Sequence, residues 1–187
     1  MKLIDLKKIH QGKYLSYYVA TYETEKGNIK EYEFISRDRD LSLDKFGHNK
    51  PAGVGLVAYS EDKKKVLLES EFRLATNNWV YNFPAGLIDE GEDALKAAKR
   101  ELEEETGLKV VDVEAILPPS FASQGTSDEM MQIVICTCKG EIRKSCFDVE
   151  EINTKWYTKE EVRKLIEDKA YMSVRTQMFL WQWINEK

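Results

Sequence analysis

The side chains best suited to chemistry in this sequence are three closely spaced glutamates, Glu101, Glu104 and Glu105. They lie in a stretch from Glu92 to Thr106 that is rich in Ala, Leu, Lys, Arg and Glu, which favour helices. Spacings of three and four residues bring the three carboxylates to one face of a helix. Hard divalent cations bind oxygen ligands, and Mg²⁺ or Mn²⁺ suits carboxylates and water best. A helix face of this kind could therefore hold a divalent cation.

The segment around these glutamates is strongly acidic. Between Asp89 and Glu105 eight acids stand against three bases, a net charge of −5 that equals the charge of the whole chain. Like charges at these spacings destabilise an exposed helix by about 0.2–0.5 kcal/mol per pair. A bound cation relieves the repulsion, and Arg100, four residues before Glu104, can brace the carboxylates. A solvated acidic helix is the alternative interpretation of the same charges.

Glycines mark both ends of the acidic segment. Residues Gly86 to Gly91 carry two glycines and no apolar periodicity, which predicts a turn before the helix. Gly107 supplies a left-handed residue that ends the helix, and Leu108 then folds back onto it. The apolar residues of the helix recur at helical spacing and predict one buried stripe, made of Leu95, Ala98 and Leu102.

The whole stretch from Gly86 to Leu108 resembles the signature of the Nudix hydrolase family. Its seven fixed positions are filled by Gly86, Glu92, Arg100, Glu101, Glu104, Glu105 and Gly107. A chance match at one starting position has a probability on the order of 10⁻⁹. The resemblance implies an α/β fold, an α/β/α sandwich with a mixed sheet, and cleavage of a nucleoside diphosphate linked to another group X. It also implies that the metal ligands are the carbonyl of Ala85 and the carboxylates of Glu101, Glu104 and Glu105, with Arg100 and Glu104 supporting catalysis.

Three further segments resemble the ADP-ribose pyrophosphatase branch of that family: Glu71-Phe72-Arg73, Pro84-Ala85-Gly86 and Ser123–Glu129. The resemblance implies that the substrate is ADP-ribose, that Arg73 contacts a phosphate, and that the other substrate contacts are Ser127, Asp128 and Glu129. A surface ion pair for Arg73 and a plain polar turn for residues 127–129 are the alternatives.

Two positions depart from the pattern of this branch. Gln124 stands where the branch has a proline, and Asn82 stands where a glutamate is usual. A proline would fix φ near −65° and rigidify the loop, so Gln124 changes how the sugar end is held. A pyrophosphatase for another nucleotide sugar or a dinucleotide is therefore the alternative. A non-catalytic Nudix-fold sensor of such a ligand is the alternative of another class, and the intact glutamates argue against it.

The general base is expected on a loop after the signature helix. In the ADP-ribose pyrophosphatases this base is a glutamate on a mobile loop, and here residues 141–153 form the polar segment that corresponds to it. This segment carries Asp148, Glu150 and Glu151; we favour Glu150 as the base, with Glu151 as the alternative. A base on such a loop would close over the substrate as a lid.

The first 48 residues are expected to form a separate β unit. Lys13 to Tyr22 and Asn28 to Ser36 are rich in Tyr, Val, Ile and Phe and are separated by a turn, which predicts a β-hairpin. Residues 49–187 then form the hydrolase domain. In the ADP-ribose pyrophosphatase branch a sheet of this kind makes a dimer interface, so the resemblance implies a homodimer.

The remaining chain predicts strands interleaved with two further helices. Strands are expected over residues 53–59, 65–69, 79–83, 110–117, 131–137 and 155–157. Thr158 and Glu161 form a capping box that opens one helix, and Ser173 caps the last one. Cys136 and Cys138 lie two residues apart on a strand and point to the same face, as reduced, partly buried thiols.

Composition limits the class of protein. The chain has 187 residues, 42% of them hydrophobic and 33% charged, which is typical of a soluble globular domain. The sequence has no basic stripe that would predict binding of nucleic acid. It also has no apolar run of 18 residues that would predict a membrane span. We therefore expect a cytoplasmic protein, and the resemblance implies that it is an enzyme whose partner is a small molecule, a nucleotide sugar.

Overall fold

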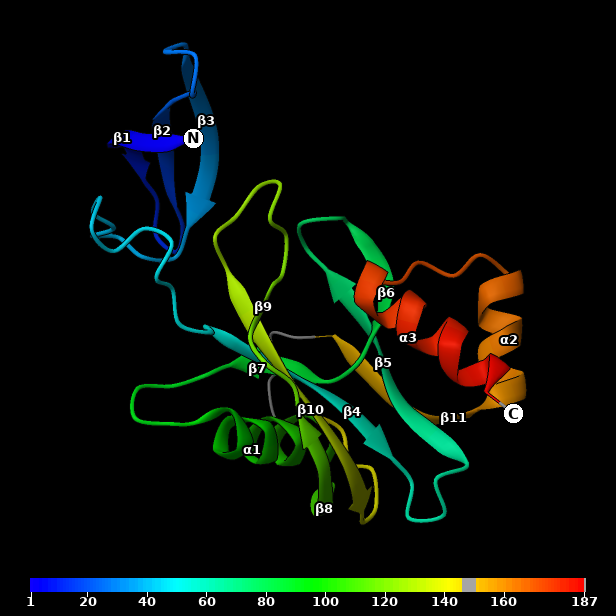
Figure 1. Ribbon diagram of the computed structural model, residues 1–187. Helices are drawn as coiled ribbons and strands as arrows, with labels where there is room; N and C mark the ends of the chain where they lie inside the picture. The colour runs from blue at the N-terminus through cyan, green and yellow to red at the C-terminus, as the bar shows by residue number, and fades with distance from the viewer. Residues whose placement is uncertain (146–150, 187) are drawn as a thin grey trace. The chain divides into compact units, whose positions relative to one another are not determined.

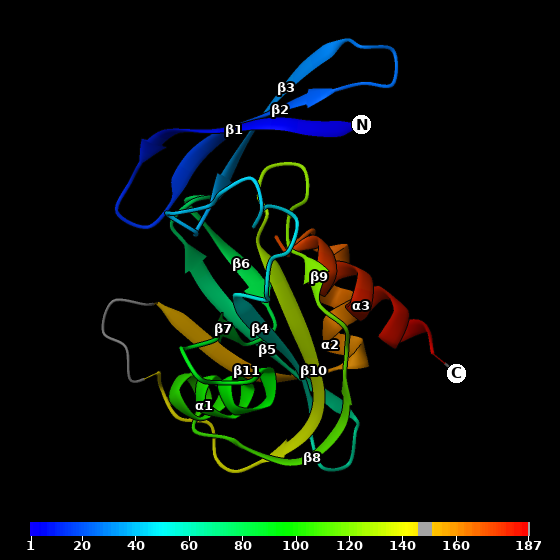
Figure 2. The same cartoon turned by 60° about the vertical axis from the view of Figure 1, so that its left-hand side comes forward.

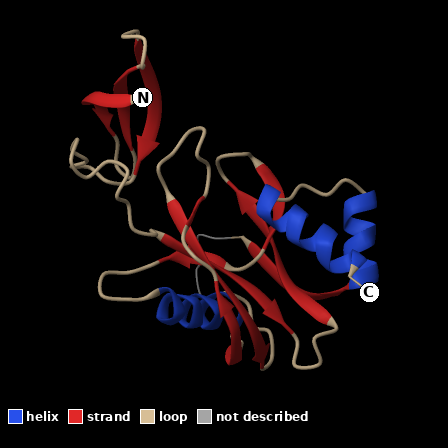
Figure 3. Ribbon diagram, viewed as in Figure 1, coloured by secondary structure: helices blue, strands red, loops and turns tan. Residues whose placement is uncertain are grey.

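The computed structural model describes residues 1–145 and 151–186. The chain divides into two compact units (Figures 1 and 3). One unit contains Met1–Ala52 together with Pro119–Met131, and the other contains Gly53–Pro118 together with Gln132–Lys187. The segment 119–131 therefore packs with the N-terminal residues, although it lies in the middle of the hydrolase sequence.

The larger unit is built on a mixed sheet. Its strands run in the order β11-β5-β4-β10-β8, with β6 paired to β5 and β7 paired to β4. These strands are β4 (Gly53–Tyr59), β5 (Lys65–Arg73), β6 (Asn78–Asn82), β7 (Ala85–Leu87), β8 (Lys109–Ile116), β10 (Met130–Lys139) and β11 (Ile152–Thr158). Strands β11 and β6 each pair antiparallel with β5, whereas the neighbouring strands β4 and β10 run in the same direction (Figure 1).

Helices cover both faces of this sheet. Helix α1 (Ala94–Thr106) packs on one face around a core of small and aliphatic side chains that includes Leu67, Ala98 and Leu102. Helices α2 (Lys159–Glu167) and α3 (Val174–Asn185) pack on the other face, as Figure 3 shows. The expected α/β/α sandwich is thus confirmed. None of the described helices is long and apolar enough to cross a membrane.

The N-terminal unit is a three-stranded antiparallel sheet (Figure 2). It contains β1 (Lys2–Gln11), β2 (Ser16–Glu23) and β3 (Ile29–Ser36), in that order. Its small core forms around Tyr18, Ala20 and Phe34, and the ring of Phe34 stacks on Phe46 at 4.8 Å between centroids. The short strand β9 (Ser120–Phe121) pairs with Met130 and Met131 at the start of β10. The predicted hairpin is present as β2 and β3, and β1 adds a third strand that the sequence did not predict.

Helix boundaries agree closely with their sequence signals. Asp93 caps α1 by accepting the backbone N–H of Lys96 at 2.8 Å, and Gly107 ends the helix with φ 75°. Both halves of the predicted capping box at Thr158 and Glu161 are made. Ser173 caps α3, also as predicted. These local signals place the helices to within one or two residues.

Candidate active site

Helix α1 carries the candidate catalytic carboxylates on the edge of its buried face. Ala97, Ala98 and Leu102 are fully buried against the sheet and fix the rotation of the helix. Glu101 and Glu105 lie beside this stripe and are only 8% and 6% exposed. Burial of two glutamates on one helix needs compensation, because a buried carboxylate loses its hydration.

Arg100 supplies part of that compensation. Its Nη1 donates to Glu101 Oε1 at 2.8 Å and to Glu104 Oε2 at 3.2 Å. Its Nη2 donates to Glu92 Oε2 at 2.9 Å and to the carbonyl oxygen of Leu87 at 2.9 Å. The hydrogen bond to Glu92 is the main reason that the pKa of Arg100 is raised, and the same contact lowers the pKa of Glu92. Arg100 thus braces the glutamates of the helix, as the sequence predicts, and it also links them to the loop before the helix.

The lack of a side chain at Gly86 leaves space for the carboxylate of Glu101. A β-carbon added to Gly86 would lie 2.0–2.3 Å from the carboxylate atoms of Glu101, so residue 86 must be a glycine for Glu101 to remain there. Strand β7 holds Gly86 by pairing it with Val54 of β4. Burial raises the pKa of Glu101, and the Arg100 guanidinium opposes this rise. The structure therefore keeps a desolvated carboxylate at a fixed point beside the backbone of Ala85 and Gly86.

The donor types of this cluster suit a hard divalent cation. The carboxylates of Glu101, Glu104 and Glu105 and the carbonyl of Ala85 are all oxygen ligands, and the space at Gly86 keeps Glu101 within reach of the loop. Among residues 1–145 and 151–186, however, no three acidic, His or Cys side chains converge closely enough to hold a metal as they stand. Arg100 engages Glu101 and Glu104 in this arrangement. The residues fit the group by chemistry, and their ligand roles remain a proposal.

A further buried carboxylate, Glu69 on β5, was missed by the sequence analysis. It is 2% exposed and its Oε1 accepts a hydrogen bond from Thr154 Oγ1 at 3.3 Å. Alternation along β5 places it on the same face as Leu67, which packs in the α1 core. Its cross-strand neighbour on β6 is Asn82, the residue that departs from the family pattern. A glutamate at an inward position of an apolar strand was the available signal.

The end of β5 that carries Arg73 also contacts the backbone of Glu151. The backbone N–H of Phe72 donates to the carbonyl of Glu151 at 3.1 Å, which fixes Glu151 beside the end of β5. Arg73 Nη1 contacts Glu71 Oε1 at 2.6 Å and its side chain is 55% exposed. The arginine therefore makes an exposed ion pair while facing solvent. The other candidate base, Glu150, lies outside the described residues.

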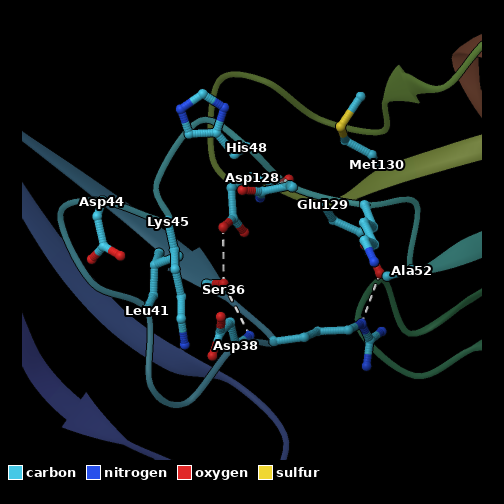
Figure 4. Close-up of a pocket in the computed structure, with 13 residues that line it drawn as sticks. Ser36, Asp38, Leu41, Asp44, Lys45, His48, Ala52, Asp128, Glu129 and Met130 are labelled. Carbon is cyan, nitrogen blue, oxygen red and sulfur yellow. Dashed lines mark hydrogen bonds and ion pairs between the residues drawn. The ribbon is translucent and has the colours of Figure 1, made fainter. Parts of the chain in front are cut away.

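The predicted substrate loop belongs to the N-terminal unit. Asp128 Oδ2 accepts the hydroxyl of Ser36 at 2.9 Å, and Glu129 Oε1 pairs with Arg37 Nε at 2.7 Å. Ser127 forms a parallel bridge with Ile35 of β3. The two acids line a cavity of about 570 Å³. Figure 4 shows Asp128 pointing toward Ser36, with His48 beside Asp128 and Ala52 beside Glu129.

The two cysteines of β10 are structural. Cys136 and Cys138 lie on the same face of β10, as their spacing predicts, and both are fully buried in the α1 core rather than partly buried as expected. Burial raises the pKa of each thiol to about 12, so neither forms a thiolate near neutral pH. They pack as small apolar side chains.

The fold is an α/β/α sandwich. Its candidate site is a helix whose glutamates bond to an arginine and which follows a loop with a glycine, and this combination defines a Nudix-type protein. Residues 49–176 match the NUDIX domain family, and the chain belongs to that family. It is similar to an ADP-ribose pyrophosphatase of Bacillus subtilis (strain 168), with 25% identity over 177 residues, 94% of this chain and 88% of that relative. It is also 28% identical over 135 residues to an ADP-sugar pyrophosphatase of Mus musculus, which covers 71% of this chain and 59% of the relative.

A solved structure shows the same fold. The crystal structure of an ADP compounds hydrolase superposes with a TM-score of 0.72, covering 97% of this chain and 91% of that one at 19% identity. This protein is thus a Nudix hydrolase that resembles the ADP-ribose pyrophosphatase branch.

Proposed function

We propose that this protein is a metal-dependent pyrophosphatase that cleaves ADP-ribose to AMP and ribose 5-phosphate. The observation that carries the proposal is the buried carboxylate of Glu101, held between Gly86 and Arg100 on the same helix as Glu104 and Glu105. The Bacillus subtilis relative, named an ADP-ribose pyrophosphatase, supports this substrate.

Four groups of the chain would hold the metal, Mg²⁺ or Mn²⁺. They are the carbonyl of Ala85 and the carboxylates of Glu101, Glu104 and Glu105. When bound, the cation neutralises the pyrophosphate and lowers the pKa of its water. Arg100 keeps Glu101 and Glu104 oriented through its hydrogen bonds at 2.8 and 3.2 Å.

The reaction adds one water across one phosphoanhydride bond. A base on the loop, Glu150 in our assignment with Glu151 as the alternative, takes a proton from water. The water oxygen bonds to one phosphorus, and the bridging P–O bond breaks with its electron pair going to the departing phosphate. Arg73 is 55% exposed and would pair with a phosphate oxygen. Ser127, Asp128 and Glu129 would contact the sugar end.

The second candidate is the same cleavage of another nucleotide sugar or a dinucleotide. Gln124 favours it, because the proline that rigidifies the substrate loop in the ADP-ribose branch is missing here. We also propose that the protein works as a cytoplasmic homodimer through its N-terminal sheet.

Product analysis with a substrate panel tests the proposal. We would incubate the protein and Mg²⁺ with ADP-ribose, ADP-glucose, UDP-glucose, NADH and diadenosine polyphosphates. AMP and ribose 5-phosphate, formed fastest from ADP-ribose, are the expected products. If another member of the panel is cleaved faster, that compound is the preferred substrate and the proposed cleavage still holds. Tight binding without any turnover would support the sensor instead.

A further inference from the structure

The substrate loop is tied to strand β3 at several successive residues. The hydroxyl of Tyr32 donates to the carbonyl of Gly125 at 2.8 Å, and the backbone N–H of Ile35 donates to the carbonyl of Thr126 at 2.9 Å. Farther along, Ser36 bonds to Asp128 and Arg37 to Glu129. The exposed edge of the N-terminal sheet thus follows the loop from its tip to its acidic end.

The tip of the loop is a turn centred on Gln124 and Gly125. The backbone N–H of Thr126 donates to the carbonyl of Ser123 at 2.9 Å, which closes the turn. Gly125 does not have a positive φ, so the turn has no need of glycine there. A proline at the first central position would preset the backbone for such a turn. Gln124 lacks this constraint. The tip keeps internal bonds from the backbone N–H of Ser127 to the carbonyl of Ser123 and between the hydroxyls of Ser123 and Thr126, both at 2.9 Å, and an external contact adds to them.

Tyr32 makes that contact without serving the core. Its side chain is 42% exposed, and Tyr18, Ala20 and Phe34 form the buried core of this sheet without it. An exposed hydroxyl exchanges its protein partner for water at little cost to the fold. The bond between Tyr32 and Gly125 therefore acts mainly on the order of the loop.

We propose that Tyr32 is a positioning residue that fixes the substrate loop in place of the missing proline at residue 124. By holding the carbonyl of Gly125, it sets the conformation from which Ser127, Asp128 and Glu129 meet the sugar end of the substrate. Asp128 and Glu129, which follow the tip along the chain, line the cavity (Figure 4). The effect on the substrate rests on the function proposed above, whereas the effect on the loop does not.

Three variants test the assignment: Tyr32→Phe, which removes only the hydroxyl, Tyr14→Phe as its control, and Tyr32→Phe combined with Gln124→Pro. Tyr14 is another exposed tyrosine of the same unit, at 67% exposure. We expect Tyr32→Phe to speed amide hydrogen exchange over residues 123–129 and to raise KM for ADP-ribose about threefold to tenfold, the range for one net hydrogen bond. kcat should stay within about twofold, since the carboxylates of α1 are untouched.

Rescue separates positioning from a general structural role. Adding Gln124→Pro to Tyr32→Phe should restore slow exchange and most of the original KM, because the proline constrains the same turn. Unchanged exchange in Tyr32→Phe, or equal effects of Tyr14→Phe, would overturn the assignment. Failure of the proline to rescue either readout would also overturn it. If ADP-ribose is not a substrate at all, the exchange data still decide the role of Tyr32 and only the proposed function falls.

Discussion

The carboxylate of Glu101 occupies the space that a side chain on Gly86 would need, since a β-carbon there would lie 2.0 Å from the carboxyl carbon. The need for a glycine at this position and the placement of the glutamate carboxylate are therefore coupled. Burial raises the pKa of this carboxyl, which shows that the site holds it at an energetic cost. Such a cost is typical of a functional group.

Gly86→Ala should remove activity by displacing Glu101. The φ of Gly86 is not positive, so alanine fits the backbone and the fold should persist. We expect kcat/KM to fall about 10²–10³-fold, the scale for losing one group that stabilises transition-state charge. Steady-state kinetics and circular dichroism would measure both effects. In the Glu101→Gln background the alanine should add little, and full additivity would contradict the coupling.

Glu105→Gln should abolish most activity and leave the fold intact, because the amide keeps the shape of the side chain but is a poor ligand for a hard cation. Glu103→Gln is the matched control on the same helix. Glu103 pairs with Lys109 at 3.1 Å, with both side chains more than half exposed, so the pair contributes little. Equal losses in the two variants, measured by turnover at saturating Mg²⁺, would remove the ligand assignment.

The general base can be identified by comparing Glu150→Gln with Glu151→Gln. We expect Glu150→Gln to lower kcat about 10²–10⁴-fold, the usual contribution of a general base. Glu151→Gln should have a smaller effect, because the backbone of Glu151 is fixed by Phe72 at the start of β11. The reverse order would assign the base to Glu151, and full activity in both would exclude a base on this loop.

The capping box of α2 should make part of the stability depend on pH. A hydrogen bond from Lys155, then those from Thr158, lower the pKa of Glu161 from 4.5 to about 2. Because its pKa is lower in the folded state, the ionised carboxylate stabilises the fold at pH values above about 4.5. This stabilisation is lost as the pH falls from about 4.5 towards 2. Thr158→Ala should cost about 1 kcal/mol at neutral pH. Urea unfolding would check this. In Glu161→Gln, which removes the titrating carboxylate, the loss of stability should shrink as the pH falls towards 2, and a loss that stays constant would contradict the role of Glu161.

Local signals in the sequence were sufficient to predict the helices and the contact of Arg100 with the glutamates of α1. Asp93, Thr158 and Ser173 cap their helices through side chains that lie next to the helical residues in sequence. The contact between Arg100 and Glu104 follows from helical spacing alone. Such interactions depend on a few neighbouring residues, so no knowledge of the tertiary structure is needed.

Strand β1 was not predicted because its periodicity is broken. Leu3 and Leu6 both pack on the core of the N-terminal sheet although they are three residues apart. Register shifts between Leu3 and Asp5, and between Lys8 and His10, interrupt the alternation that marks a strand. A pattern of period two cannot be recognised across such bulges.

The position of Glu69 and the attachment of the substrate loop depend on long-range pairing. Glu69 is buried beside Asn82 and Thr154, which come from two other strands. The bond from Tyr32 to Gly125 joins residues 93 positions apart. The place of Glu69 on an apolar strand is a local signal of its burial. Its partners on the other strands and the bond from Tyr32 to Gly125 leave no such signal, so only the structure could assign them.

The most direct test of the account is AMP formation from ADP-ribose with Mg²⁺ and again after the metal has been removed with a chelator. We predict stoichiometric AMP and ribose 5-phosphate with Mg²⁺, no turnover without it, and full recovery when Mg²⁺ is restored. Turnover that persists without the metal would contradict the roles given to Glu101 and Glu105. Products other than a nucleoside monophosphate and a sugar phosphate would contradict the cleavage itself.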